Sequence, residues 1–280
     1  VTAWTLQPAK LKIMPLKFLD NNGSGTTSGA IRAIYYAVNN GARVLNNSWG
    51  GGGFSSALVD AITYSYTNRA LFVAAAGNAS NNNDASATYP ANYAVPNVVS
   101  VAATSSMDGF ASFSNYGRST VHMGSPGVSI WSTFPNESFG SSSGTSMAAP
   151  FSSGVAAMMM REKPTMSGYE AKNILFSGSQ AVASLTSRTT TGSRLNIYLS
   201  ILAAKNTSVD GSQPAFSASS IRAPASAEME APACGLVAKK MLDSSSGGGP
   251  SGPLKNLTFF AVLLLLVSPI LVSVALRERD

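Results

Sequence analysis

The chain has 280 residues, a formal net charge of +6, one cysteine and one histidine. A single cysteine excludes an internal disulfide framework and a cysteine-based metal site, and the scattered basic residues give nucleic-acid binding no support. The length is enough for one α/β domain with a sizeable core and appendages. Only 11% of the residues are charged, which together with 25 glycines favours a loop-rich, exported protein.

Strand and helix signals alternate along the first two hundred residues. The predicted elements are a strand at 12–19, a helix that starts after Ser24–Thr27 and ends at Asn40-Gly41, a strand at 43–48, a helix around 58–66, and buried strands at 71–76 and 97–103. This βαβαβ order predicts a doubly wound α/β fold, in which helices cover both faces of a parallel sheet.

The composition changes after about residue 204. Residues 205–256 are rich in Ser, Ala, Pro and Gly, which is typical of a linker. Residues 257–276 form an uncharged apolar stretch that matches the ~20 residues needed to span a bilayer, and a buried core helix is the weaker alternative. We therefore predict a domain over 1–204, a linker, one transmembrane helix at 257–276 and a basic tail at 277–280.

The basic tail predicts the orientation of this span. Arg277 and Arg279 favour a cytoplasmic C-terminus, so the folded domain is expected outside the cell, at its surface. Gly247–Gly249 before a terminal apolar span also resembles bacterial C-terminal sorting signals, in which case the span would be removed after export. At the other end, the chain starts at Val1 without a signal-peptide pattern, and we interpret it as incomplete at the N-terminus.

The strongest local motif surrounds Ser146. Small residues flank it in Ser143–Pro150, and a helix-like apolar run follows. Gly144 allows a tight turn, and Pro150 suits the first turn of a helix, where its missing N–H costs nothing. Ser146 is therefore expected at a helix N-terminus, among unpaired backbone N–H groups. From these residues alone, a Gly-Ser turn that merely caps a helix is an equal alternative.

The segment Gly144–Pro150 resembles the nucleophile motif of the subtilisin-like serine proteases (subtilases). The resemblance runs from about Lys12 to Ala204 and includes three further stretches in family order: Leu45–Gly51, Val73–Asn78, and Ala111–Gly117 with Ser125–Val128. It implies that residues 1–204 are the larger part of a subtilisin-like peptidase domain that hydrolyses polypeptides through an acyl-enzyme.

The resemblance also implies roles for individual residues. Ser146 would attack the scissile carbonyl, while the Asn78 side chain and the Ser146 backbone N–H would stabilise the oxyanion. The substrate would be added as an extended strand between two segments. These are Ser48, Trp49 and Gly50, and Ala75, Ala76 and Gly77. Trp49 could equally be a packing residue.

The sequence departs from the family in lacking the motifs of the catalytic Asp and His. Subtilases use Asp, His and Ser in that chain order, and neither the Asp nor the His motif occurs here. His122 matches no family base position, and Phe151 replaces a structural His that the family commonly carries after the proline. We therefore expect the Asp and His in a missing upstream segment and the chain alone to be inactive.

Several alternatives follow from the same residues. A non-catalytic, membrane-anchored peptide-binding protein is the main one, although the presence of Ser146 and Asn78 favours an enzyme. The related Ser-Glu-Asp carboxyl peptidases place Asp at the position of Asn78, so Asn78 argues against them. An α/β-hydrolase needs a His after its serine, and no His follows Ser146. The resemblance allows calcium as a cofactor, but Asp84 and Asp108 show no ligand spacing, so no metal ligand is predicted.

Overall fold

The computed structural model describes residues 11–134, 137–221 and 223. The helices are α1 (Thr27–Asn39), α2 (Ser56–Thr67), α3 (Thr145–Glu162), α4 (Gly168–Ser177) and α5 (Ile197–Asn206), with short 3₁₀ helices η2 (Ala183–Leu185) and η3 (Ala218–Ser220). The strands are β1 (Val44–Asn47), β2 (Leu71–Ala75), β3 (Val98–Thr104), β4 (Met123–Pro126), β5 (Ile130–Phe134), β6 (Ser138–Ser142), β7 (Gln180–Ala181) and β8 (Ser193–Arg194).

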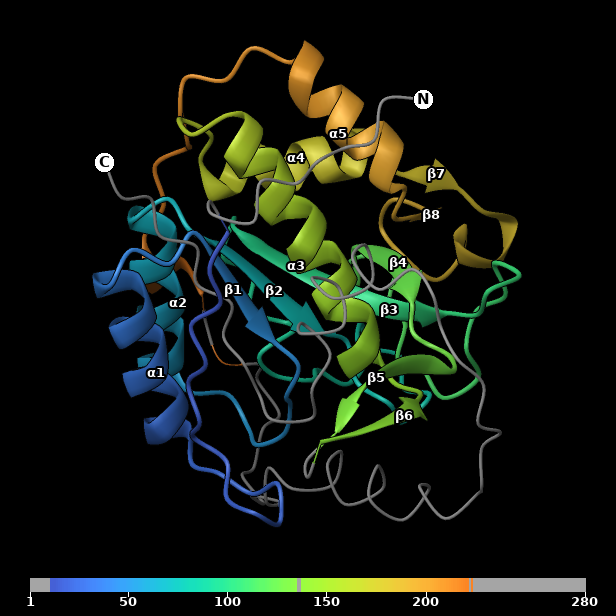
Figure 1. The fold of residues 1–280 in the computed structure, drawn as a ribbon. Helices are drawn as coiled ribbons and strands as arrows, with labels where there is room; N and C mark the ends of the chain where they lie inside the picture. Colours follow the sequence, from blue (N-terminus) through green and yellow to red (C-terminus); the bar gives the residue numbers. More distant parts are fainter. Residues whose placement is uncertain (1–10, 135–136, 222, 224–280) are drawn as a thin grey trace.

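Six of these strands form one sheet in the order β1-β2-β3-β4-β8-β7. Neighbouring strands are parallel from β1 to β8, and only β7 is antiparallel to its neighbour. Figure 1 shows α1 and α2 on one side of the sheet and α3 across the other. Strands β5 and β6 form a separate antiparallel hairpin. The described residues confirm the predicted α/β fold with a mostly parallel, doubly covered sheet.

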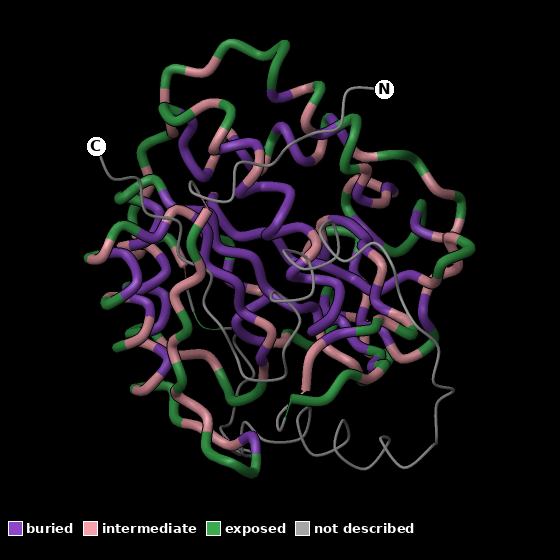
Figure 2. The backbone as a smooth tube through the Cα atoms, in the orientation of Figure 1, coloured by how far each residue is buried: buried purple, intermediate pink, exposed green. Residues whose placement is uncertain are grey.

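Successive side chains along the strands belong alternately to two hydrophobic clusters, one on each face of the sheet. Leu45 and Phe72 pack with α1 and α2, whereas Val44 and Val73 pack with α3, α4 and α5. Every residue of β1, β2 and β3 is buried, and these strands form the buried centre of the molecule in Figure 2. Because both faces are covered, β2 is a continuous apolar run and β3 is largely apolar, as predicted for 71–76 and 97–103.

Helices α1 and α2 begin where the sequence offers a cap. The Thr26 side chain accepts a hydrogen bond from the Gly29 N–H at 3.0 Å, and the Ser55 side chain accepts one from the Leu58 N–H at 3.3 Å. Each cap satisfies one of the backbone donors that a helix leaves unpaired in its first turn. The predicted positions of these two helices are confirmed.

The predicted strand at 12–19 is wrong. This segment carries no strand in the structure, apart from an isolated bridge between Leu19 and Gly25. Its apolar side chains still pack against both clusters, among them Ile13 and Phe18. A strand requires a hydrogen-bonded neighbour, no described segment provides one, and Pro15 has no N–H to donate.

Residues 207–221, here called the C-terminal strap, lie within the predicted linker. The Oε1 atom of Glu170 accepts hydrogen bonds from the N–H groups of Asp210 and Gly211, at 3.1 and 3.2 Å. Its Oε2 atom accepts one from the Ser167 N–H at 2.7 Å and so completes the capping box of α4. The strap then reaches α2, where the rings of Phe216 and Tyr66 meet edge to face.

The predicted transmembrane helix at 257–276 and the basic tail lie outside the described residues. Among the residues that the structure describes, no helix is both long and apolar enough to span a bilayer.

Candidate functional site

Two loops and the start of α3 bring the predicted site residues to one edge of the sheet. Ser48 follows β1 and Asn78 lies three residues beyond β2, and these strands are parallel with Asn47 opposite Ala74. The carboxyl ends of parallel strands meet at the same edge, which is where ligands bind in open α/β sheets. Ser146 is the second residue of α3, and its neighbour Thr145 contacts Asn78 directly.

The side chain of Asn78 is held in one orientation by Thr145. Its Oδ1 atom accepts hydrogen bonds from both the backbone N–H and the hydroxyl of Thr145, each at 2.8 Å. The same hydroxyl accepts a bond from the Gly77 N–H at 3.1 Å. Because the carbonyl end of the amide is fixed, the Nδ2 end points away from Thr145, and it has no hydrogen-bond partner among the described residues. Asn78 therefore offers a fixed donor.

Gly77 permits the turn that precedes Asn78. Its φ angle is +113°, in the region that L side chains rarely adopt. A Cβ atom there would also lie 2.3 Å from Nδ2 of Asn115. Any side chain at position 77 would displace the loop that carries Asn78.

Ser146 lies at the uncapped N-terminus of α3. Its N-cap residue, Gly144, has no side chain to cap the helix, but Asn78 Oδ1 accepts the Thr145 N–H at 2.8 Å. The positive end of the α3 dipole therefore lies at Ser146, next to Asn78. The sequence analysis predicted Pro150 in the first turn of the helix. The structure places it in the second turn of α3, so this prediction is wrong. A residue with an N–H at this position would donate to the Ser146 carbonyl, one helical turn earlier.

Ser48 supplies the hydrogen bond that Pro150 cannot make. Its hydroxyl donates to the Ser146 carbonyl at 2.8 Å and accepts from the Asn46 Nδ2 atom at 2.9 Å. The Asn46 Oδ1 atom in turn accepts from the Ser153 hydroxyl at 2.9 Å. This chain of side chains joins β1 to α3, so the Ser48 hydroxyl has a structural partner.

The side chains of the two predicted substrate-binding segments face inward. Trp49 is only 7% exposed, meets Phe18 edge to face, and donates from Nε1 to the Asn47 side chain at 3.1 Å. Trp49 is therefore a packing residue. Ala75 and Ala76 are buried as well. Contacts of these segments with a peptide would have to come chiefly from their backbones.

His122 is far from this edge. It directly precedes β4, at the amino end of that strand, whereas the site lies at the carboxyl ends of the parallel strands. Its Nδ1 atom accepts the Ser100 N–H at 2.8 Å, and its ring stacks on Phe176. Burial, followed by the charge of Lys172, lowers the pKa of His122 to about 3. His122 is therefore a neutral packing residue and no base for Ser146.

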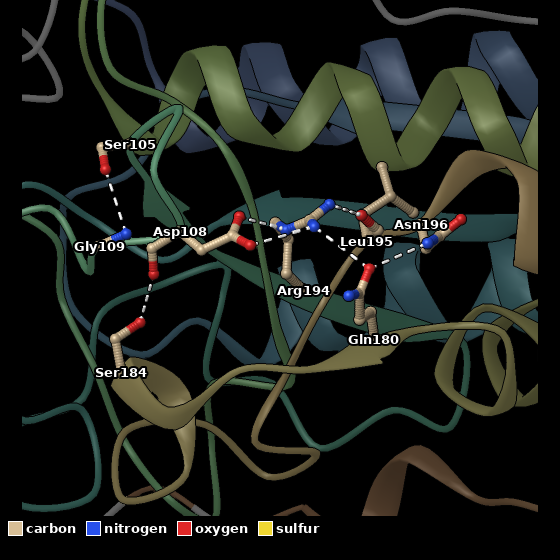
Figure 3. Close-up of polar contacts among 8 residues, drawn as sticks. All are labelled: Ser105, Asp108, Gly109, Gln180, Ser184, Arg194, Leu195 and Asn196. Carbon is tan, nitrogen blue, oxygen red and sulfur yellow. Dashed lines mark hydrogen bonds and ion pairs between the residues drawn. The ribbon is translucent and has the colours of Figure 1, made fainter.

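The aspartates considered for calcium are engaged by protein groups. Figure 3 shows the carboxylate of Asp108 facing the guanidinium of Arg194, with an Nε–Oδ1 distance of 2.6 Å. The Asp84 carboxylate accepts hydrogen bonds from the backbone of Ser119 and from Thr120. Calcium takes six to eight oxygen ligands, and the described residues contain no cluster of three acidic, His or Cys side chains. These aspartates do not fit a calcium site.

Sequence reasoning missed several residues around this edge. Thr145 orients Asn78, and its place directly before the serine is the signal that could have indicated it. Asn46 and Ser153, which anchor Ser48, carry no local signal because they meet only in the folded chain. Asn83 and Asn115, which lie behind Gly77, are likewise brought together only by folding.

A serine at a helix N-terminus beside a fixed amide donor suits acyl transfer, in which charge develops on a carbonyl oxygen. The comparison with protein families agrees with this class of enzyme. Residues 8–227 match the model of the subtilase family, and the chain belongs to that family. The predicted family is therefore confirmed.

Individual relatives and solved structures are similar to parts of the chain. Thermitase from Thermoactinomyces vulgaris is 41% identical over 165 residues, and subtilisin DY from Bacillus licheniformis is 39% identical over 168 residues. The aligned regions cover 59% and 60% of this chain, and 55% and 60% of those relatives. A cold-adapted subtilisin-like serine proteinase superimposes with a TM-score of 0.58 at 37% identity, over 63% of each chain. The chain thus spans little more than half the length of these relatives.

Proposed function

We propose that this protein is a serine endopeptidase that hydrolyses polypeptides through an acyl-enzyme, with Ser146 as the nucleophile. Asn78 Nδ2 and the Ser146 backbone N–H are the donors to the oxyanion. The observation that carries this proposal is the pair of hydrogen bonds from Thr145 to Asn78 Oδ1, because they fix the carbonyl end of the carboxamide and leave Nδ2 available as a donor next to Ser146 in the chain's fold. A donor fixed before the reaction stabilises the transition state without reorganisation.

The proposed enzyme needs a catalytic His, and the Asp that orients it, from outside this sequence. A serine hydroxyl is a weak nucleophile unless a positioned base takes its proton. The only histidine of the chain hydrogen-bonds to Ser100, with its pKa lowered to about 3. We propose that the Asp and His belong to an upstream segment and that residues 1–280 alone do not turn over substrate.

Peptide substrates are proposed to bind as an added strand along Ser48–Gly50 and Ala75–Gly77. Because the Trp49 and alanine side chains are buried, main-chain contacts would dominate and sequence preference would be low. Both segments lie at the carboxyl ends of the neighbouring parallel strands β1 and β2, which supports this proposal. Family membership supports polypeptides as the substrate class.

Amidase activity on an unselective peptide substrate tests the proposal. Residues 1–280 should be inactive, and the chain joined to an upstream segment with the family's Asp and His motifs should be active. Asn78→Ala in the active form should lower kcat by ~10²–10³, the effect established for an oxyanion donor in subtilisin itself, with KM nearly unchanged. Ser146→Ala should abolish turnover. Absence of turnover from the joined chain would favour a non-catalytic peptide-binding protein.

We also propose that the protein acts at the cell surface, held in the membrane by residues 257–276. The uncharged stretch followed by Arg277 and Arg279 supports this location. Cell fractionation should find the full-length protein in the membrane fraction and the same protein truncated after residue 256 in the soluble fraction. Equal partitioning of both would refute the anchor.

A further inference from the structure

The loop that carries Asn78 lies along a second segment of the chain. The N–H of Ser80 donates to the Phe113 carbonyl at 2.9 Å, and the N–H of Asn83 donates to the Tyr116 carbonyl at 2.7 Å. The N–H of Asn115 donates back to the Gly77 carbonyl at 2.9 Å. The position of Asn78 therefore depends on residues some 35 positions later in the chain.

The side chain of Asn115 uses all four of its hydrogen-bonding positions at this junction. Its Oδ1 atom accepts from the N–H groups of Ala79 and Asn81, at 2.8 and 3.1 Å. Its Nδ2 atom donates to Asn83 Oδ1 at 3.0 Å and to the Thr88 hydroxyl at 3.2 Å. Asn115 is 1% exposed, so water cannot readily replace these partners.

Together, Asn115 and Asn83 hold the backbone on both sides of Asn78. Asn83 Nδ2 donates to the carbonyl of Ala76 at 2.9 Å, on the β2 side of the turn. Asn115 holds the carbonyl of Gly77 with its own N–H and the N–H of Ala79 with its side chain. Thr145, in contrast, fixes the side chain of Asn78 itself.

We propose that Asn115 is a positioning residue, which acts on catalysis by holding the turn that aims Asn78 at the oxyanion. This inference rests on the proposed function, in which Asn78 is the donor. Asn115 itself does not contact the substrate, because its side chain is buried behind Gly77 and its polar atoms are fully engaged. Its role differs from general stabilisation of the fold, and the difference can be measured.

The main experiment is a double-mutant cycle in the active form of the enzyme. Asn115→Ala should lower kcat by ~10- to 10²-fold with little change in KM, because a displacement of about 1 Å in a catalytic group costs up to that factor. In the Asn78→Ala background, the same substitution should have almost no further effect on kcat, since the group that it positions is already gone.

Asn97→Ala is the matched control. Asn97 is also a fully buried asparagine, whose Nδ2 donates to the Ser65 hydroxyl and the Ala70 carbonyl at the opposite end of the sheet. Its substitution should lower stability without the selective loss of kcat. If Asn115→Ala lowers kcat by the same factor with and without Asn78, or if Asn97→Ala gives the same kinetic change, the positioning role is wrong.

A second measurement does not depend on turnover. In a crystal structure of Asn115→Ala, the Asn78 carboxamide should no longer make both hydrogen bonds to Thr145. An Asn78 side chain that stays in place would overturn the inference, whatever the enzyme does. Conversely, a joined chain without Ser146-dependent turnover would refute the proposed function, while a displaced Asn78 in this crystal structure would still support the geometric link.

Discussion

The Ser48 hydroxyl replaces the backbone donor that Pro150 lacks, and this substitution leads to a prediction about stability. Ser48→Ala removes the donor to the Ser146 carbonyl and the acceptor of the Asn46 Nδ2 atom. An unsatisfied buried polar group costs about 1–3 kcal/mol. Because both contacts are only partly buried, the two groups together should lower the free energy of unfolding by about 2–4 kcal/mol, less than two full penalties.

Pro150→Ala should partly rescue this loss. An alanine at position 150 restores the N–H that donates to the Ser146 carbonyl one turn earlier, but it leaves the Asn46 donor without its acceptor. The cost of Ser48→Ala should therefore be smaller by about 1–2 kcal/mol in the Pro150→Ala background, which is one restored hydrogen bond.

Urea unfolding of the four proteins in the cycle measures this coupling. The midpoints give the differences in free energy, provided that the slopes m are unchanged. Ser48→Thr keeps the hydroxyl and serves as the control. If Ser48→Ala costs the same with proline and with alanine at position 150, the Ser48 hydroxyl does not substitute for the missing backbone donor and the reasoning is refuted.

Two further predictions concern Thr145 and His122. Thr145→Val removes the hydroxyl that fixes Asn78 and should lower kcat of the active form by about 10-fold or more, whereas Thr145→Ser keeps the hydroxyl and should retain kcat; equal kcat values for Val and Ser would contradict this. The pKa of His122 is lowered from 6.5 to about 3, so protonation favours the unfolded chain. The free energy of unfolding that the neutral His122 contributes should therefore be lost as the pH falls from 6.5 to 3. His122→Asn keeps an acceptor for the Ser100 N–H, so urea midpoints measured across this range should fall less steeply than in the parent.

The sequence predicts the fold well wherever its signals are local. Helix α1 has a capping threonine, a periodic apolar face and a terminating Asn40-Gly41, so its ends follow from the residues themselves. The segment 12–19 shows the limit of such reasoning. Its apolar residues indicate side chains that pack against the clusters, and they do so partly buried, whereas a strand also needs a partner that only the folded sheet can provide.

The candidate site shows the same division. The motif around Ser146 and the segment ending at Asn78 could be recognised because each is contiguous in the chain. The contacts that fix them are not contiguous: Thr145 is 67 residues from Asn78, and Ser48 is 98 residues from Ser146. The position of Pro150 within α3 also depends on where the helix begins, and helix boundaries are poorly determined by sequence.

Glu170 couples local unfolding of the strap to local unfolding of the start of α4. One carboxylate holds the first N–H of the α4 cap with one oxygen and two N–H groups of the strap with the other. The strap cannot detach without leaving those amides unpaired and loosening the side chain that caps α4. The backbone amides of Ser167, Asp210 and Gly211 should therefore exchange with solvent through one cooperative local unfolding, although 40 residues separate the two segments. Exchange at the strap amides thereby reports on the integrity of helix α4, in the body of the domain.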